Sequence, residues 1–266
     1  MPMENDRLVD DPRGLIFIGV LLGLWWLVTS GLGLFPNFIL PSPEAVWHSA
    51  IKLSFPEQPQ GIMMGYGESL WGDIMDSTLR LFGAFAISAG IGIPLGVLMG
   101  MVPMVGAALD PLLQGFRPIP PIAWTPLAIL WFGIGLQSVI FIIFLGAFWP
   151  ILINTIAGVR EVRPLLIRAG RCLGASRSQI FARIMIPAAM PFIFTGVRSG
   201  VTVGWWMIVP AEMIASQSGL GFLIMRARAN GQMPDVITGM IAIALVGYCL
   251  HLGLQYLGRL RLFRGA

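Results

Sequence analysis

The stretch RAGRCLGASRSQIFARIMIPAAMP, residues 168–191, decides how the rest of this chain is understood. It is a basic, amphipathic run of helix-forming residues between two long apolar stretches. Four of its residues are arginines, too close together to lie in hydrocarbon: Arg168, Arg171, Arg177 and Arg183. We therefore expect the chain to leave a bilayer here, to form a basic helical hairpin at its surface, and to re-enter at Pro187.

The composition around this stretch is that of a membrane protein. The 266 residues are 56% hydrophobic and only 11% charged, with a mean hydropathy of +0.80. A soluble domain carries about a quarter charged residues, so this apolar surface requires lipid as its solvent. The pI of about 9.7 reflects arginines gathered in a few loops, and we expect contact with membrane lipid and no binding of nucleic acid. The fold class is therefore all-α integral membrane protein.

Six segments are apolar and long enough to be membrane spans. They are residues 15–33, 78–102, 107–132, 138–158, 190–213 and 236–257. We expect two units. Residues 1–76 hold an N-terminal tail, the first span and an interfacial segment, and residues 77–266 hold the core with a surface loop at 160–190.

Arginine placement predicts the orientation of the spans. Seven of the seventeen basic residues lie between Arg160 and Arg198, and further arginines flank the first and last spans. With six spans these regions fall on one side, which the positive-inside rule makes cytoplasmic. Both termini are then cytoplasmic. Arg80 and Arg117 lie near predicted span ends, where we expect their side chains to snorkel.

Two features between these charged regions concern packing. The segment after the first span is too polar and proline-rich to cross a bilayer, and we expect short interfacial helices there, one starting after Ser42 with Pro43 in its first turn. The second span carries Gly92, Gly96 and Gly100 at four-residue spacing, a ridge of small residues that lets another helix approach closely.

The third span is predicted to be broken. Pro118, Pro120 and Pro121 fall within FRPIPPIAW, and three prolines in four residues cannot continue a helix. The backbone groups released at membrane depth must be buried by protein or line a wet path. Two interpretations stay open: a pathway element that includes Pro120, Pro121 and Trp124, or a buried kink packed by its neighbours.

The fifth span combines indoles with a carboxylate. Trp205 and Trp206 lie within it and Glu212 lies near its end. Indole N–H groups can attract an oxyanion weakly without trapping it, so these residues are candidates for a translocation pathway and an outer gate. Alternatively the tryptophans only pack, and Glu212 is an interfacial acid bonded to nearby backbone or to Arg226 or Arg228.

Residues 168–191 resemble the cytoplasmic signature loop of permease subunits in binding-protein-dependent ABC importers. That pattern is Glu-Ala-Ala, three residues, Gly, nine residues, and Ile-x-apolar-Pro. Five residues match in register: Ala169, Gly174, Ile184, Ile186 and Pro187. Arg168 replaces the Glu and Gly170 replaces the second Ala. The stretches 40–47, 109–135 and 194–215 are similar to the nitrate, sulfonate, taurine and bicarbonate branch of these permeases.

The resemblance implies a type I importer permease fold in a bacterial inner membrane. It implies that a short coupling helix in the loop docks on a cytoplasmic ATPase. The residues expected at that contact are Arg168, Ala169, Gly170, Arg171, Gly174, Ala175, Ser176, Arg177, Ile184 and Pro187. It further implies two ATPase subunits, a second permease subunit, most simply an identical copy, and a periplasmic binding protein that delivers a small anion.

The chain itself is expected to be non-catalytic. It contains no Gly-rich phosphate loop of the G-x-x-x-x-G-K-[ST] type, so the resemblance implies that ATP and Mg are bound by the partner and that this chain carries no cofactor. An ion-coupled secondary transporter is the alternative, but no acidic group is evident near the middle of a span to bind the coupling ion. The two histidines, His48 and His251, give little support for a membrane enzyme. A basic amphipathic helix on anionic lipid is the alternative for the loop itself.

Overall fold

The computed structural model describes residues 12–55 and 69–258, and every regular element in these ranges is helical. Four helical segments are long and apolar enough to cross a bilayer. They contain α3 (Leu70–Met101), α6 (Leu136–Arg160), α9 (Ile186–Ala215) and α11 (Met233–Gly258). These match four of the six predicted spans, so the predicted all-α membrane fold is confirmed.

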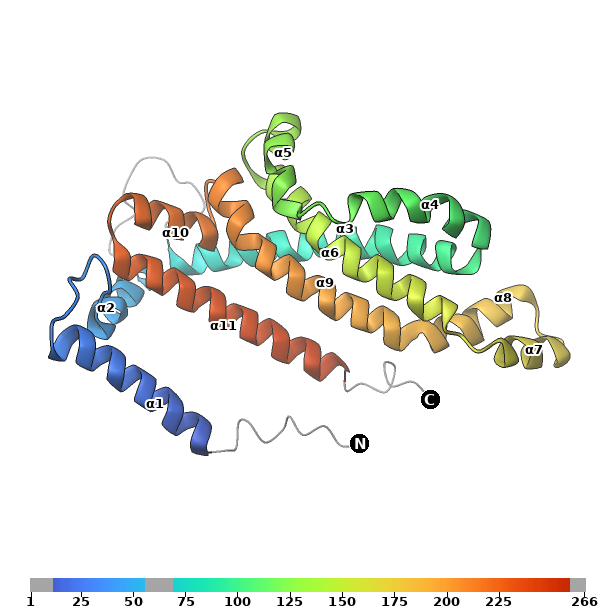
Figure 1. Ribbon diagram of the computed structural model, residues 1–266, viewed down its shortest axis with the longest axis horizontal. Helices are drawn as coiled ribbons and strands as arrows, with labels where there is room; N and C mark the ends of the chain where they lie inside the picture. Colours follow the sequence, from blue (N-terminus) through green and yellow to red (C-terminus); the bar gives the residue numbers. More distant parts are fainter. Residues whose placement is uncertain (1–11, 56–68, 259–266) are drawn as a thin grey trace.

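The core is built from α3, α6 and α9, which make the most extensive contacts in the described chain, with α6 packed against both other helices (Figure 1). The predicted small-residue ridge of α3 faces α6, where a β-carbon on Gly96 would lie only 2.7 Å from Cβ of Thr155. Gly200 of α9 approaches α6 as closely, since its β-carbon would lie 3.0 Å from the carbonyl oxygen of Ala147. Close packing of small residues replaces the hydrophobic effect as the attraction between helices in lipid.

The third predicted span is two helices instead of one. α4 (Pro103–Phe116) packs back along α3. A 3₁₀ turn, η3 (Pro121–Trp124), then leads to α5 (Thr125–Phe132), which turns away from α4 (Figure 1). The prediction of a break is confirmed and the prediction of one span over residues 107–132 is wrong. The prolines between Phe116 and Ala123 explain the result, because they remove backbone donors and prevent the α4 helix from continuing.

α2 (Pro43–Ser54) is the predicted helix after Ser42. Ser42 caps it, with its side-chain oxygen accepting a hydrogen bond from the Ala45 backbone N–H at 3.2 Å. The helix packs on the start of α11, where Ser49 donates a hydrogen bond to Asp235 over 2.6 Å. α2 therefore anchors one end of α11.

α1 (Pro12–Trp26) continues as a π-helical turn, η2 (Leu27–Gly31). It contacts the rest of the chain through α2, and its described side chains are mostly exposed. Ser30 and Trp26 each donate a hydrogen bond to the Glu44 carboxylate at 2.7 Å. The hydrogen bond from Ser30 contributes most to lowering the pKa of Glu44, to about 2, so the contact persists at any physiological pH.

Two short helices, α7 (Pro164–Cys172) and α8 (Arg177–Ile180), stand at one end of the molecule, which we call the hairpin end (Figure 1). α2 and α10 (Leu220–Ala229) lie at the opposite end. The first turn of α1 and the last turn of α11 both point toward the hairpin end. The N-terminal tail and the arginines after α11, which entered the orientation argument, lie outside the described residues.

Candidate functional site

The predicted hairpin at residues 160–190 is two helices joined by a tight turn. Gly174 forms this turn with φ of +78°, a conformation that favours glycine because it has no β-carbon. Ser176 then caps α8 in a capping box: its side chain accepts from the Gln179 backbone N–H, and the Gln179 side chain accepts from the Ser176 N–H at 2.8 Å. The sequence S-x-x-Q is the local signal for this helix start.

Contacts between residues of the hairpin itself hold its two helices together. Gly170 is buried, and a β-carbon there would lie 2.6 Å from Cδ1 of Ile184 and 3.6 Å from Cγ1 of Ile180. This contact accounts for glycine where the family pattern has its second alanine, because an alanine would have to displace the tip of Ile184. The apolar residues of α8 and the following turn thus hold α7 in place.

The outer surface of the hairpin is exposed. Leu173, at its tip, is 88% exposed, although it is a large apolar residue. The predicted contact residues that lie on this exposed surface are Arg168, Ala169, Arg171, Gly174, Ser176, Arg177 and Pro187. Ala175 and Ile184 are half-buried. The hairpin therefore presents an exposed apolar tip surrounded by arginines, and protein interfaces combine an apolar centre with enriched arginine.

The chain re-enters the helical bundle at Pro187, as predicted. α9 begins at Ile186 with Pro187 in its first turn, where the missing N–H of proline is tolerated. The preceding residues Phe181–Met185 form a π-helical turn closed by a hydrogen bond from the Ile186 N–H to the Phe181 carbonyl. The hairpin is consequently joined to α9 by continuous helical backbone.

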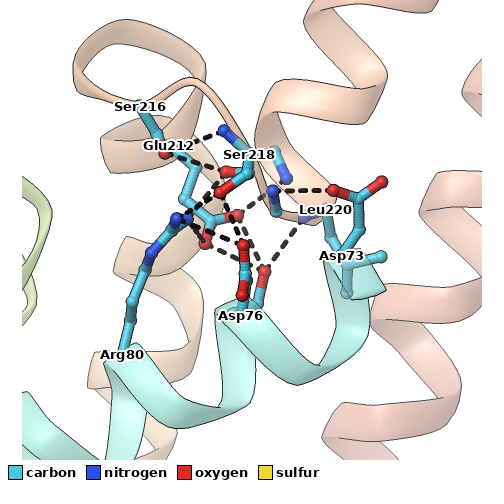
Figure 2. Close-up of polar contacts among 10 residues, drawn as sticks. Asp73, Asp76, Arg80, Glu212, Ser216, Ser218 and Leu220 are labelled. Carbon is cyan, nitrogen blue, oxygen red and sulfur yellow. Dashed lines mark hydrogen bonds and ion pairs between the residues drawn. The ribbon is translucent and has the colours of Figure 1, made fainter. Parts of the chain in front are cut away.

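A second cluster of charged groups lies at the opposite end of the core, between α3 and α9. Arg80 donates a hydrogen bond to the Glu212 carboxylate at 2.8 Å and another to the Ser218 carbonyl at 2.7 Å (Figure 2). Asp76 lies 3.6 Å from the same guanidinium and accepts a hydrogen bond from the Ser218 hydroxyl. Glu212 is fully buried and Arg80 is 8% exposed. We call this set, with Asp73, Ser77 and Ser216, the buried network.

The buried network fixes the connection between α9 and α10. The Gly219 N–H donates to Asp73 at 2.8 Å, and the Leu220 N–H donates to the Ser77 hydroxyl at 2.9 Å. Glu212 also accepts from the Gly221 N–H at 2.9 Å. These bonds join the first two turns of α3 to the loop that follows α9 (Figure 2). Its carboxylates are already occupied by protein donors, so the network is suited to holding two helices together.

The expected hydrogen bond from nearby backbone to Glu212 is present, since the Gly221 N–H donates to it, but two expectations about side chains are wrong. The side-chain partner of Glu212 is Arg80 of α3, and neither Arg226 nor Arg228 pairs with it in the described chain. Arg80 itself does not snorkel to a surface, because it is buried and paired. Asp76 and Arg80 stand four residues apart on one helix face, and this spacing within an apolar helix is the sequence signal for the pair.

The predicted pathway residues fall in separate places. Trp205 and Trp206 line a cavity of about 500 Å³ between α9 and α11, together with Thr202 and His251. Glu212 does not line that cavity. Pro120, Pro121 and Trp124 belong to the break between α4 and α5 and do not line it either. Pro120 is exposed and the other two are half-buried.

Family membership follows from the sequence. Residues 92–260, which include the end of α3, the whole of α6 and α9, the hairpin, and Glu212, Ser216 and Ser218 of the buried network, match the family described as binding-protein-dependent transport system inner membrane component. The chain belongs to this family. It is an inner-membrane permease component of a transport system, and the alternative of an ion-coupled secondary transporter is set aside.

Relatives and a solved structure agree with this assignment. The chain is 39% identical over 242 residues to the taurine transport system permease protein TauC of Escherichia coli K12, covering 91% of this chain and 86% of that one. It is 37% identical over 246 residues to the nitrate import permease protein NrtB of Synechocystis, covering 92% and 87%. A chain of the inward-facing MetNI methionine ABC transporter shares the fold, with a TM-score of 0.63 and 20% identity over 71% of this chain and 94% of that one. The predicted importer permease fold is confirmed.

Proposed function

We propose that this permease passes a small oxyanion of the nitrate or sulfonate class inward across the membrane. The names of its relatives support this class, since one is a taurine permease and another a nitrate permease. Nitrate is an anion and taurine is a zwitterion with a sulfonate group, and in both the negative charge is shared among oxygen atoms around one central atom. Bicarbonate, expected from the resemblance, has similar chemistry and belongs to the same proposal.

The energy for transport comes from partner subunits. The observation that carries this part of the proposal is the hairpin, an ordered surface with an apolar tip, rimmed by arginines and joined without interruption to α9. We propose that an ATPase subunit, which binds the ATP and Mg, holds this hairpin in a cleft. Closure of two such subunits would then move α9 against α6.

The assembly and its orientation complete the proposal. The hairpin end faces the cytoplasm, with both termini on that side, as the arginine distribution predicts. Two copies of the permease enclose the path, and a periplasmic binding protein delivers the anion at the end that carries α2 and α10. The exposed Arg226 and Arg228 of α10 lie at that entrance, where they would attract anions or acidic groups of the binding protein.

The candidate pathway residues form separate groups, and each group serves a different section of the path. Trp205 and Trp206 offer indole N–H groups beside the α9–α11 cavity, and Pro120, Pro121 and Trp124 form the break in which the chain departs from helical hydrogen bonding. Glu212 serves the outer gate by locking α9 to α3 through Arg80. Weak contacts suit a path that must release its cargo, because selectivity can reside in the binding protein.

The substitution Leu173→Asp tests the ATPase contact. Leu173 is almost fully exposed and is not part of the described core, so aspartate does not disturb folding, but it places a charge in an apolar contact. Burying an unpaired charge costs several kcal/mol. We expect the variant to reach the membrane at the normal level and to lose the ATPase subunit during purification.

Phe55→Asp is the matched control, because Phe55 is 73% exposed but lies after α2, at the opposite end of the molecule. It should retain the ATPase. If Leu173→Asp retained the ATPase and transported at the normal rate, the proposal that the hairpin is the ATPase contact would be overturned.

A further inference from the structure

Arg117 occupies an unexpected position. It directly follows α4, which begins at Pro103 beside the hairpin end of the core and contains 14 residues. At about 1.5 Å per residue the helix carries Arg117 about 21 Å along α3, and α4 packs antiparallel to α3. The hydrocarbon core of a bilayer is about 30 Å thick. With 14 residues α4 is shorter than this thickness, so it places Arg117 well away from the hairpin end of the core, with its side chain exposed in the described chain.

Contacts of α4 with its neighbours support this distance between Arg117 and the hairpin end. Near its start, a β-carbon on Gly106 would lie 2.9 Å from both the Met99 carbonyl oxygen and the guanidinium of Arg160, which are close to the last residues of α3 and α6. Seven residues before Arg117, Asp110 lies 3.5 Å from Arg160. Arg117 is thus about 10 Å further from the hairpin end than this ion pair.

The side chain of Arg117 lines a cavity of about 400 Å³ between α4 and α6. The charged and polar residues around this cavity are Asp110, Gln114, Arg117 and Arg160, and Trp149 adds an indole N–H. Asp110 faces Arg160, so one of the two arginines is compensated. Arg117 has no ion-pair or side-chain hydrogen-bond partner within residues 12–55 and 69–258. The described lining therefore carries one unbalanced positive charge.

An exposed guanidinium with no partner in the described chain is available to bind a counterion. The cavity is large enough for an oxyanion with its hydration, and it opens beside the break that holds the candidate pathway residues, since the Trp124 ring lies 6.0 Å from that of Phe116, the neighbour of Arg117. A guanidinium with an amide and an indole nearby supplies donors to several oxygen atoms of one anion. The cavity thus has the position, volume and charge of an anion site.

We propose that the α4–α6 cavity is a transient binding site for the transported oxyanion on the inner half of the path, with Arg117 as its anion-binding group. This inference rests on the proposed function and extends it, because it places a specific site between the break and the hairpin end. Binding to one arginine with few further contacts is weak, which permits release toward Arg160 and the cavity mouth. The same chemistry would also hold the phosphate of an anionic lipid, and the test separates the two sources.

The first experiment measures transport. The whole importer, with its ATPase and binding protein, is reconstituted in phosphatidylcholine vesicles, and ATP-driven uptake of labelled taurine, nitrate and bicarbonate is followed. We expect Arg117→Gln to lower uptake of the imported anion at least tenfold while ATP hydrolysis stimulated by the binding protein continues, and Arg117→Lys to restore a large part of it. Lys52→Gln, which removes an exposed charge on α2, is the control and should transport normally.

The second experiment does not depend on knowing the cargo. Ile153, which lines the cavity, is replaced by cysteine after Cys172 and Cys249 are changed to serine, and the rates of modification by an anionic sulfonatoethyl and a cationic trimethylammonioethyl methanethiosulfonate are compared in the assembled importer. We expect the anionic reagent to be favoured and Arg117→Gln to reduce the ratio of rates by roughly tenfold. Lys52→Gln should leave the ratio unchanged.

The two experiments distinguish failure of the proposed function from failure of the anion site. Failure of the unmodified importer to take up any of the three anions would refute the proposed function, and the thiol ratio would still decide the charge of the cavity. Normal uptake by Arg117→Gln together with an unchanged ratio would overturn the anion site alone. An effect of Arg117→Gln that appears only after phosphatidylglycerol is added to the vesicles would assign the site to lipid and overturn the inference.

Discussion

Arg80 and Glu212 show what a single ion pair contributes in this protein. Their charges are almost completely removed from solvent, so each pays a desolvation cost that only the partner and the surrounding hydrogen bonds offset. Ser77, Ser218 and the Gly221 N–H supply those bonds. The pair therefore fixes which groups of α3 and α9 face each other, and it is costly to disrupt on one side only.

A double-mutant cycle tests this account of the pair. Glu212→Gln leaves buried Arg80 with only the longer contact to Asp76, and Arg80→Met leaves buried Glu212 without a cation, so we expect each change to lower the free energy of unfolding by about 3–5 kcal/mol. The double variant should lose less than the sum of the two. Thermal unfolding of the purified permease in detergent micelles gives the values.

The exposed pair Asp110–Arg160, at 3.5 Å and with side chains 38% and 49% exposed, provides the comparison. Asp110→Asn should cost less than about 1 kcal/mol, because solvent screens an exposed pair. Additive effects of Glu212→Gln and Arg80→Met would mean that the two groups do not act together.

The close contact between α3 and α6 is possible because glycines of α3 have no side chain. A β-carbon on Gly96 would fall 2.7 Å from Cβ of Thr155, on a rigid branched side chain, and 3.1 Å from the Leu152 carbonyl oxygen. Gly90 lies on the same helix with nothing within 4 Å of its β-carbon position. One helix thus contains both a packed and an open glycine.

Gly96→Ala and Gly90→Ala form a matched pair. We expect Gly96→Ala to destabilise the protein by about 1–3 kcal/mol, because the helices must separate, and Gly90→Ala to be neutral or to stabilise by up to about 1 kcal/mol, because alanine favours the helix. Thermal unfolding in micelles measures both. Equal effects of the two substitutions would show that the ridge is not a packing surface.

Some helices could be predicted from the sequence, and others only in part. The long apolar helices, the start of α2 after Ser42 and the hairpin before Pro187 were predictable because local signals define them. The division of residues 107–132 into α4 and α5 was predicted only as a break, since hydropathy does not report the direction in which the chain continues after proline. The position of Arg117 beside the α4–α6 cavity could not be predicted for the same reason.

At the scale of the whole molecule, the contacts that could not be predicted from the sequence join residues far apart in the chain. Arg80 and Glu212 are 132 positions apart, and only the antiparallel arrangement of α3 and α9 brings them together. The sequence identified the hairpin by its spacing, but it did not indicate that Gly170 packs against Ile184. Both cases require three-dimensional packing in addition to local pattern.

The account as a whole rests on the position of the hairpin relative to the membrane and the ATPase. Cys172, exposed at the end of α7, is a native reporter of that position, and Cys249→Ser removes the other cysteine. In this background a membrane-impermeant maleimide should label Cys172 in inside-out vesicles and not in right-side-out ones, and bound ATPase should slow the reaction at least tenfold because the contact excludes the reagent. Labelling from the outer face, or an equal rate with and without the ATPase, would contradict the account.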